Sequence, residues 1–429
     1  MSDLVNVDSK QRSVRILIIA AVVVASLFSW IGVRRQMGNL IAEMTTVADP
    51  TAPEVAQLAR GMAPSDPLGM WLTASLERSF FNPERTDGAV LMFEDTVRLA
   101  PRDYRWWIEL GRANEQSDKI VQAETALRYA VNMAPTYTYP RWQIGNFYLR
   151  QGRPDEAFVE LKAATINNFA YREQVYSLAW DYFDNDPTMV EKLVIDQPDA
   201  YASLALFYAV RGRATDALRV WNKISDQDKA GYGQFVKLMT QGLYDKRFYR
   251  QALSFAKDTG VDTDAEAMTI TNGGFETALG NPDDTYFGWK IVRTDGKVDI
   301  SSDSSVKHGG ARSLRLAFRS YSKPELANVF QIVVVEPGKT YRLKFWLRTE
   351  MLKSAGVPQI DIVNANDDKL ITSSRPFPLG TNDWQEVAVD FTAPENSEGV
   401  SIRTTRAFCG DNCPILGTLW YDDFVLERK

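Results

Sequence analysis

Histidine and cysteine are nearly missing from this chain of 429 residues, which has one histidine, His308, and two cysteines, Cys409 and Cys413. Zinc sites are built largely from these two residue types, and a Ser-His or Cys-His nucleophilic pair needs an imidazole. We therefore predict a protein that is not an enzyme. A glycoside hydrolase stays open as the less favoured alternative, because it needs only two carboxylates and the sequence has 55 acidic residues.

Excess positive charge is also missing, since the formal net charge is −6. Proteins that bind nucleic acid present a clustered basic surface, so we expect no nucleic-acid partner. A content of 45% hydrophobic and 24% charged residues is ordinary for a globular chain. At ~100–200 residues per domain, the length predicts two or three domains.

One long apolar run lies near the N-terminus. It extends from Ile16 to Val33 without a charge, and Arg34 and Arg35 follow it directly. This is about the minimum length of a transmembrane helix, and Trp30 lies where an interfacial aromatic would. A cleaved signal peptide is the alternative, but its apolar region is usually ~7–15 residues and a small-residue cleavage site would follow. We therefore predict a single-pass anchor at residues 16–33, with the later chain soluble.

Two features predict the orientation of this anchor. Three basic residues (Lys10, Arg12 and Arg15) precede the span and two follow it, which favours a cytoplasmic tail at residues 1–15. Cys409 and Cys413 lie together in "CGDNC" and are expected to form a disulfide, which persists only outside a reducing cytosol. We therefore predict a protein of the bacterial inner membrane whose bulk is periplasmic or otherwise extracytoplasmic.

A sequence repeat organises the middle of the chain. The separation in sequence between Pro101 and Pro135 is one period of this repeat. The same spacing separates three pairs of small residues, Gly111 and Gly145, Ala123 and Ala157, and Ala130 and Ala164. Further along the chain the pattern recurs at a longer spacing, because Tyr148 and Tyr208 are as far apart in sequence as Ala157 and Ala217. Because this longer spacing is about two helical turns short of two periods, one unit is expected to be truncated, at Ala179–Leu193.

Apolar residues within each unit fall at helical spacing, which predicts two amphipathic helices joined by a short turn and ended by a proline. This pattern, including its period, resembles the tetratricopeptide repeat over about residues 65–257. The matching positions are Trp107, Leu110, Gly111, Ala123, Ala130 and Pro135; then Gly145, Tyr148, Ala157 and Ala164; then Tyr201, Leu204, Ala205, Tyr208, Ala217 and Trp221; and, in a looser early copy, Leu76, Phe80, Ala89, Phe93 and Pro101. The resemblance implies an α-solenoid with a concave groove for a protein partner.

Two adjacent tryptophans, Trp106 and Trp107, lie in one unit of this repeat. Trp107 matches the packing position of the repeat, whereas Trp106 lies about 100° further round the same helix. We therefore expect Trp107 to be the core residue. Trp106 is expected to face a neighbouring helix or the groove and to contribute less to stability.

From about Met268 the apolar residues alternate instead. "VFQIVVV", "TYRLKFWLRTE", "WQEVAVDFTAP" and "LWYDDFVLERK" are typical of strands, with Gly and Pro between them. The chain is thus predicted to combine α and β domains, with an antiparallel β-sandwich of jelly-roll type at residues 268–429. A juxtamembrane helical linker at 34–64 and a short linker at 258–267 would join the predicted domains.

Six motifs of this region come in the order found in family 4/9-like carbohydrate-binding modules, which the region resembles. They are "NGGFE", "FGW", "HGGARSLRL", "VEPGKTYRLKFWLR", "WQEVAVDF" and "YDDFVLE". The resemblance implies one structural calcium ion, bound by Glu276, the carbonyl of Lys307, and Asp422 or Asp423. A solvated strand end is the alternative for the two aspartates. This sandwich also occurs as a purely structural or protein-binding unit.

The alternation also predicts a sugar platform on one strand. If Tyr341, Leu343 and Phe345 face the core, their neighbours face solvent, and an exposed tryptophan beside polar groups can stack on a sugar and bind its hydroxyls. Asp361 and Arg403 are expected beside this strand, and Trp289 and Trp384 in the core. The candidate carbohydrate-binding residues are Lys344, Trp346, Arg348, Asp361 and Arg403.

Taken together, the sequence predicts a membrane-anchored extracytoplasmic scaffold. Its repeats would bind protein partners, and its sandwich would bind envelope or exported polysaccharide, in bacterial polysaccharide synthesis or export. The alternative is an assembly factor of an envelope complex whose sandwich is purely structural. Apart from a structural calcium ion, no cofactor is expected.

Overall fold

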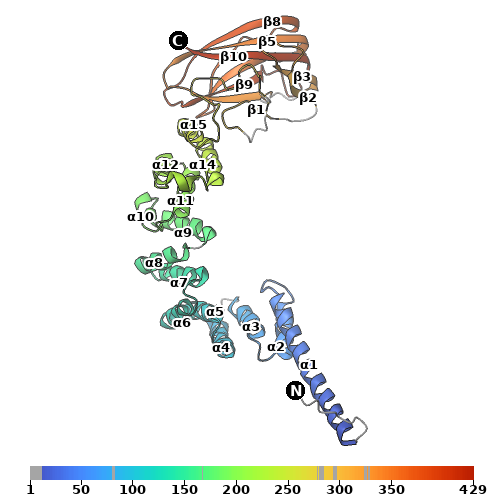
Figure 1. Cartoon of the computed structure of the whole chain (residues 1–429), viewed down its shortest axis with the longest axis vertical. Coiled ribbons are helices and arrows are strands. Elements are labelled where there is room, and N and C mark those ends of the chain that lie inside the picture. Colours follow the sequence, from blue (N-terminus) through green and yellow to red (C-terminus); the bar gives the residue numbers. More distant parts are fainter. Residues whose placement is uncertain are drawn as a thin grey trace, which may run out of the picture. The chain divides into compact units, whose positions relative to one another are not determined.

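The computed structural model describes residues 12–79, 83–166, 168–277, 279, 285–292, 297–322, 326 and 329–429. These residues form a helical region followed by a β-sandwich, as predicted (Figure 1). The chain divides into two compact units, Met1–Ile195 and Asp196–Lys429.

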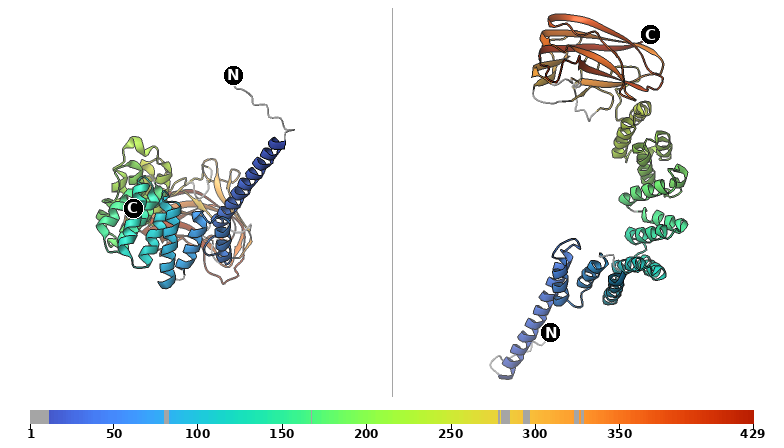
Figure 2. Two further views of the ribbon diagram at one scale, coloured as in Figure 1. Left: turned by 90° about the horizontal axis from the view of Figure 1, so that it is seen from below. Right: turned by 180° about the vertical axis from the view of Figure 1, so that it is seen from behind.

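The first unit begins with a long apolar helix, α1 (Arg12–Glu43), and a second helix, α2 (Ala52–Met62), folds back against it (Figure 2). By length and composition, α1 is long and apolar enough to cross a membrane. Beyond the apolar run, Gly38 allows close packing, because a Cβ there would lie 2.9 Å from Ala63 Cβ. The guanidinium of Arg34 donates to the carbonyl of Gly61 at 2.6 Å. Much of the predicted linker is thus a helical hairpin.

Helical hairpins follow, in which α3 packs on α4, α5 on α6, and α7 on α8. Gly111 and Gly145, one period apart, have equivalent surroundings: an added Cβ would lie 2.7 Å from Leu127 Cγ and 2.7 Å from Leu161 Cγ, respectively. The sequence period therefore corresponds to a repeat in how the helices of each hairpin pack. The helices are α3 (Pro67–Ser79), α4 (Pro83–Leu99), α5 (Tyr104–Gln116), α6 (Ile120–Met133), α7 (Thr138–Arg150), α8 (Pro154–Ala164), α9 (Phe169–Tyr182) and α10 (Pro187–Glu191). Helix α10 has only 5 residues and lies where the sequence predicts a truncated unit.

The predicted repeat core is buried except at one position. Leu110, Gly111, Ala123, Ala130, Gly145, Tyr148, Ala157, Ala164, Tyr208 and Ala217 are all buried. Trp107 is only half-buried, and its indole N–H donates to the Pro101 carbonyl at 3.0 Å. Phe80 of the looser early copy lies outside the described residues.

The structure buries Trp106 more deeply than Trp107. Trp106 is 5% exposed and lies in a core cluster with Phe93 and Leu110. Its ring centroid is 6.4 Å from that of Trp71 on α3, so it fills the space toward the preceding hairpin. Trp107 lies at the boundary between two clusters instead, with its ring 4.4 Å from Tyr129.

The second unit begins with five helices, and its β-sandwich consists of two antiparallel five-stranded sheets. The helices are α11 (Pro198–Val210), α12 (Ala214–Trp221), α13 (Asp226–Lys229), α14 (Gly233–Asp245) and α15 (Tyr249–Asp258). Sheet A has the order β1-β4-β9-β6-β7, and sheet B has the order β2-β3-β10-β5-β8. Successive strands repeatedly cross between the sheets, as in a jelly roll.

The strands are β1 (Lys290–Ile291), β2 (Val298–Asp303), β3 (Ser313–Tyr321), β4 (Val329–Val334), β5 (Thr340–Ser354), β6 (Pro358–Asn364), β7 (Leu370–Ser373), β8 (Gly380–Thr392), β9 (Gly399–Arg406) and β10 (Ile415–Arg428). The core lies between the sheets and contains Tyr341, Leu343 and Phe345 of β5 and also Trp289, as predicted. Trp384 is half-exposed, so its predicted core position was wrong. On β8 the buried residues are Val389 and Phe391. Since side chains alternate between the two faces of a strand, Trp384 lies on the face opposite to theirs.

The last helical hairpin covers part of the outer face of sheet A. Val333 on β4 faces the core between the sheets, so Ile332 and Val334 face outward, yet they are only 8% and 3% exposed. Tyr249 of α15 lies against this surface: a Cβ at Gly399 would lie 3.1 Å from Tyr249 Cδ2 and 3.3 Å from Ile332 Cγ2. The helices of this unit and the sandwich thus share buried apolar surface.

Polar contacts reinforce this junction. The Tyr249 hydroxyl donates to the carbonyl of Ala365 at 3.1 Å. Arg247 forms an ion pair with Asp368 at 2.6 Å, and Asn366 donates back to the carbonyl of Arg247 at 3.1 Å. The turn between α14 and α15 and the first residue of α15 therefore bind the β6–β7 turn directly.

Candidate functional site

Three aromatic rings gather on the outer face of sheet B. Trp346 of β5 faces outward as predicted, and the imidazole of His308, from the loop before β3, stacks on it with centroids 3.8 Å apart and planes at 13°. Trp384 of β8 meets the same imidazole edge-on at 5.8 Å. We call His308, Trp346 and Trp384 the ring platform. Two of its members, His308 and Trp384, were not among the predicted binding residues.

The ring platform is surrounded by carboxylates. In the strand register Trp346 lies opposite Asp422 of β10 on one side and opposite Glu386 of β8 on the other. His308 Nδ1 lies 2.7 Å from Asp423 Oδ2, which fixes the imidazole over the indole. Aromatic faces stack on the C–H faces of sugars, and carboxylates accept hydrogen bonds from hydroxyls. Because His308 covers one face of Trp346, a stacked sugar would use the other face or Trp384.

The two predicted basic residues of β5 also face outward, but they already have partners. Lys344 pairs with Glu427 at 2.7 Å. The guanidinium carbon of Arg348 lies 5.7 Å from the ring centroid of Trp420, and its Nε is buried without a hydrogen-bond partner. These residues flank the ring platform on its own sheet, so they could orient a polar ligand there.

Asp361 and Arg403 do not lie beside the ring platform, which corrects the prediction of one five-residue site. They face each other on β6 and β9 in sheet A, whereas β5 belongs to sheet B. Alternation along a strand predicts the face of a residue but not the sheet to which the strand belongs. Arg403 donates to Asp368 at 3.0 Å, and this hydrogen bond holds the pKa of Asp368 below its ordinary value.

The predicted calcium ligands do gather around one loop. The Asp422 carboxylate accepts hydrogen bonds from the backbone N–H groups of His308 (2.8 Å) and Gly309 (3.2 Å). Glu276 accepts from the N–H of Ala311 at 2.9 Å. Lys307 lies in the same loop. Asp422 is fully buried, and this burial raises the pKa of its carboxyl.

This loop supplies carboxylates, but they do not by themselves form a complete set of calcium ligands. Calcium takes 6–8 oxygen ligands, and the described part of the chain holds no group of three or more His, Cys, Asp or Glu placed for a metal. Asp422 and Glu276 are instead bound by backbone N–H donors. Calcium binding therefore stays a prediction, with backbone carbonyls required for most of the ligands.

A second candidate surface is a polar cavity of ≈ 500 Å³ in the first unit, between α3, α5 and α7. Its lining is Arg78, Arg112, Glu115, Gln116, Gln143 and Arg150. Arg78 and Arg112 are one period apart, and so are Gln116 and Arg150. The repeat period therefore holds for polar residues as well as for apolar and small ones, and polar residues at this spacing are the signal in the sequence that indicates this surface. Arg150 forms a bidentate pair with Glu115, at 2.8 Å for both bonds.

The C-terminal part of the chain matches a known family. Residues 267–406 match the model of the family CBM_4_9, described as carbohydrate binding domain. This match supports carbohydrate binding by the sandwich. It covers most of the two sheets, including the loop that carries His308 and the strand that carries Trp346.

Sequence relatives are distant and much longer. The tRNA(Glu)-specific nuclease WapA of Bacillus subtilis subsp. natto (strain BEST195) is 25% identical over 212 residues, which are 48% of this chain and 8% of that protein. The tRNA nuclease WapA of Bacillus subtilis (strain 168) matches to the same extent. The chain thus spans 8% of the length of these relatives.

Among solved structures, one described as "CBM4 structure and function" is 18% identical and covers 37% of this chain and 99% of its own, with a TM-score of 0.27. The CBM22-1 xylan-binding domain from Paenibacillus barcinonensis is 11% identical and covers 36% of this chain and 91% of its own, with a TM-score of 0.25.

Proposed function

We propose that this protein is a membrane-anchored, non-catalytic binding protein whose sandwich holds a glycan at the ring platform. The observation that carries the proposal is the cluster of Trp346, Trp384 and His308, ringed by carboxylates, within a region that matches a carbohydrate-binding family. Ring stacking gives affinity, and the exposed carboxylate of Glu386 and that of Asp423 select hydroxyl positions. The glycan is envelope or exported polysaccharide, and the protein serves its synthesis or export.

The helices supply the second half of the proposed function. The repeat period and the packing of Gly111 and Gly145 support the tetratricopeptide assignment. Stacked hairpins of this type present a surface for a protein partner, and the polar cavity between α3, α5 and α7 is where we place it. The protein thereby holds a protein partner and a polysaccharide on one anchored chain, outside the cytoplasm.

Glycan-array binding of the full chain in detergent tests the sugar site. We expect Trp346→Ala and Trp384→Ala each to weaken binding about two- to tenfold, since stacking on an aromatic is worth about 0.5–1.5 kcal/mol. Asp361→Ala, on the opposite sheet, is the matched control and should bind as the parent does. Loss in Asp361→Ala with full binding in both tryptophan variants would move the site to sheet A.

The alternative, an assembly factor with a purely structural sandwich, makes a different prediction in the same assay. The folded full chain would bind no glycan on the array, while variants of the polar cavity would still lose the protein partner. Calcium is tested alongside: addition of the ion should raise the melting temperature of the parent, and Asp422→Asn should remove that increase.

A further inference from the structure

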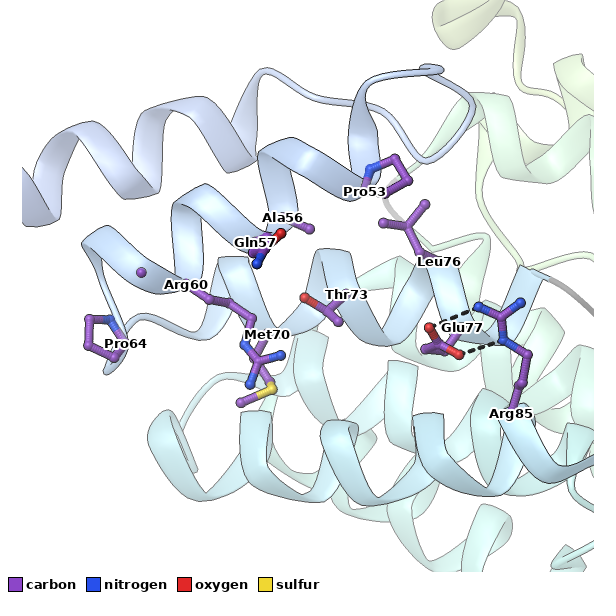
Figure 3. Close-up of a pocket in the computed structure, with 11 residues that line it drawn as sticks. Pro53, Ala56, Gln57, Arg60, Pro64, Met70, Thr73, Leu76, Glu77 and Arg85 are labelled. Carbon is purple, nitrogen blue, oxygen red and sulfur yellow. Dashed lines mark hydrogen bonds and ion pairs between the residues drawn. The ribbon is translucent and has the colours of Figure 1, made fainter.

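An open cavity of ≈ 480 Å³ lies between α2, α3 and the start of α4 (Figure 3). Its lining is Pro53, Ala56, Gln57, Arg60, Gly61, Pro64, Met70, Thr73, Leu76, Glu77 and Arg85. Figure 3 shows the Arg60 side chain reaching in beside Met70, with Gln57 and Thr73 near the middle. At the far end, Arg85 binds Glu77 through two hydrogen bonds of 2.7 and 3.1 Å.

The end of this cavity that is lined by Gly61 lies beside the end of the apolar run of α1. Arg34 and Arg35 are the first charged residues after that run. Arg34 donates to the carbonyl of Gly61, and Arg35 donates to the hydroxyl of Ser65. Gly61 itself lines the cavity. If α1 spans the membrane, the mouth of the cavity at Gly61 therefore lies at the level of the lipid headgroups.

The charges of the cavity favour an anion at this mouth. Glu77 is neutralised by Arg85, whose hydrogen bond holds the pKa of Glu77 below its ordinary value. Arg60 is exposed and forms no ion pair with any residue that the structure describes. Arg34 and Arg35 add two positive charges nearby. Guanidinium groups are suited to phosphate, which they bind through paired hydrogen bonds.

We propose that this cavity binds the headgroup of an anionic membrane phospholipid with a hydroxylated head. The phosphodiester lies at Arg60, the headgroup hydroxyls reach Gln57 and Thr73, and the acyl chains stay in the bilayer beside α1. Phosphatidylglycerol is the simplest lipid of this class. The inference rests on the proposed membrane anchoring, and it adds a lipid ligand to it.

Lipid titration of the full chain in detergent micelles, followed by native mass spectrometry, tests the proposal. We expect phosphatidylglycerol to bind at least tenfold more tightly than phosphatidylcholine. Arg60→Gln should weaken phosphatidylglycerol binding about tenfold, which corresponds to ~1.4 kcal/mol. Arg102→Gln is the matched control, since Arg102 is exposed and outside the lining, and it should bind as the parent does. Thr73→Phe should fill the half-buried middle of the cavity and weaken binding without removing a charge.

Three results would overturn this assignment: equal affinity for the two lipids, equal loss in Arg60→Gln and Arg102→Gln, or binding of inorganic phosphate as tight as that of the lipid. Carbonate extraction of membranes separates the anchoring from the lipid site. A chain that extracts as a soluble protein contradicts the anchor, whereas a chain that stays in the membrane but shows any of the three results contradicts only the lipid site.

Discussion

At the scale of single residues, Glu124 joins three helical segments of the first unit. Its carboxylate accepts hydrogen bonds from Arg153 at 2.6 Å, Arg128 at 2.8 Å and the Tyr148 hydroxyl at 3.1 Å. The hydrogen bond from Arg153 is the main cause that lowers the pKa of Glu124 to about 2. Burial raises the pKa of Tyr148 to about 12, so its hydroxyl stays protonated and donates throughout the neutral range.

This cluster predicts a defined acid sensitivity. The pKa of Glu124 is lower in the folded chain than its ordinary value of 4.5, so its stabilisation is fully present above pH 4.5 and is lost as the pH falls toward about 2. Glu124→Gln should cost about 1 kcal/mol at pH 7, and progressively less at pH 4 and pH 3. Urea unfolding at pH 7, 4 and 3 measures the difference. The same deficit at every pH would contradict the role of this carboxylate.

The adjacent tryptophans give a second prediction at this scale. Trp106 is 5% exposed, so Trp106→Ala should lower the free energy of unfolding by ~3–5 kcal/mol. Trp107 is half-buried, and Trp107→Ala should cost clearly less. Thermal melts of the two variants decide between this order and the reverse order that the repeat signature alone predicts.

These residues also show what the sequence can and cannot predict. Repeat spacing singled out Gly111 and Gly145, and each of them makes its close contact within its own hairpin. The depth of Trp106 in the core was not predicted, because its contact with Trp71 belongs to the packing between hairpins. Trp346 was assigned to the correct face by alternation. The separation of Asp361 from that face depends on long-range strand pairing, which no local pattern encodes.

At the scale of elements, the loop between β9 and β10 is closed by a disulfide between Cys409 and Cys413, with Cα atoms 5.6 Å apart. The bridge packs on Gly356, where an added Cβ would lie 2.5 Å from Cys409 Sγ. The two cysteines are separated by only 4 positions in sequence, so the disulfide constrains the unfolded chain little. The sequence predicted the pair, but not its contact with the β5–β6 turn.

Cys409→Ser should therefore leave the sandwich folded and lower its free energy of unfolding by only ~1–2 kcal/mol. Denaturant unfolding followed by circular dichroism measures the loss, and a thiol assay on protein from its native compartment checks the bond. Gly356→Ala is the partner variant: it should also destabilise the sandwich, because its Cβ has no room beside the sulfurs.

The junction between α15 and sheet A gives a prediction for a pair of elements. Tyr249→Phe removes the hydroxyl that donates to Ala365, which should cost about 1 kcal/mol. Tyr137→Phe, at a 56% exposed position in the first unit, is the matched control and should be neutral. If the two variants melt alike, the hydrogen bond from Tyr249 to Ala365 does not stabilise this junction.

At the scale of the whole molecule, the sequence predicted the order of an apolar helix, a helical region and a sandwich, and the structure confirms it. The predicted boundary at residues 258–267 differs from the division at Ile195 and Asp196. Helices α14 and α15 follow the helical pattern of the repeats, yet they pack on the sandwich. Periodicity identifies what an element is, whereas the surface that it buries depends on its tertiary partner.

The orientation in the membrane is a prediction for the whole chain. A phosphatase fused after Lys429 should be active in bacteria, because that enzyme folds only outside the cytoplasm, and a fluorescent cytosolic reporter at the same position should be dark. The opposite pair of results would place the sandwich in the cytoplasm and would leave the disulfide without an oxidising compartment.

The buried contact between α15 and sheet A has a mechanical consequence. The outer face of sheet A is partly occupied by the helices, and the ring platform lies on the outer face of the opposite sheet. A long polymer pulling on the ring platform would load the sandwich from the far side of its contact with α15. Arg247 and Tyr249 bind the β6–β7 turn directly. Tension on the sandwich would therefore be transmitted to the helices of this unit, as it would not be through a flexible linker.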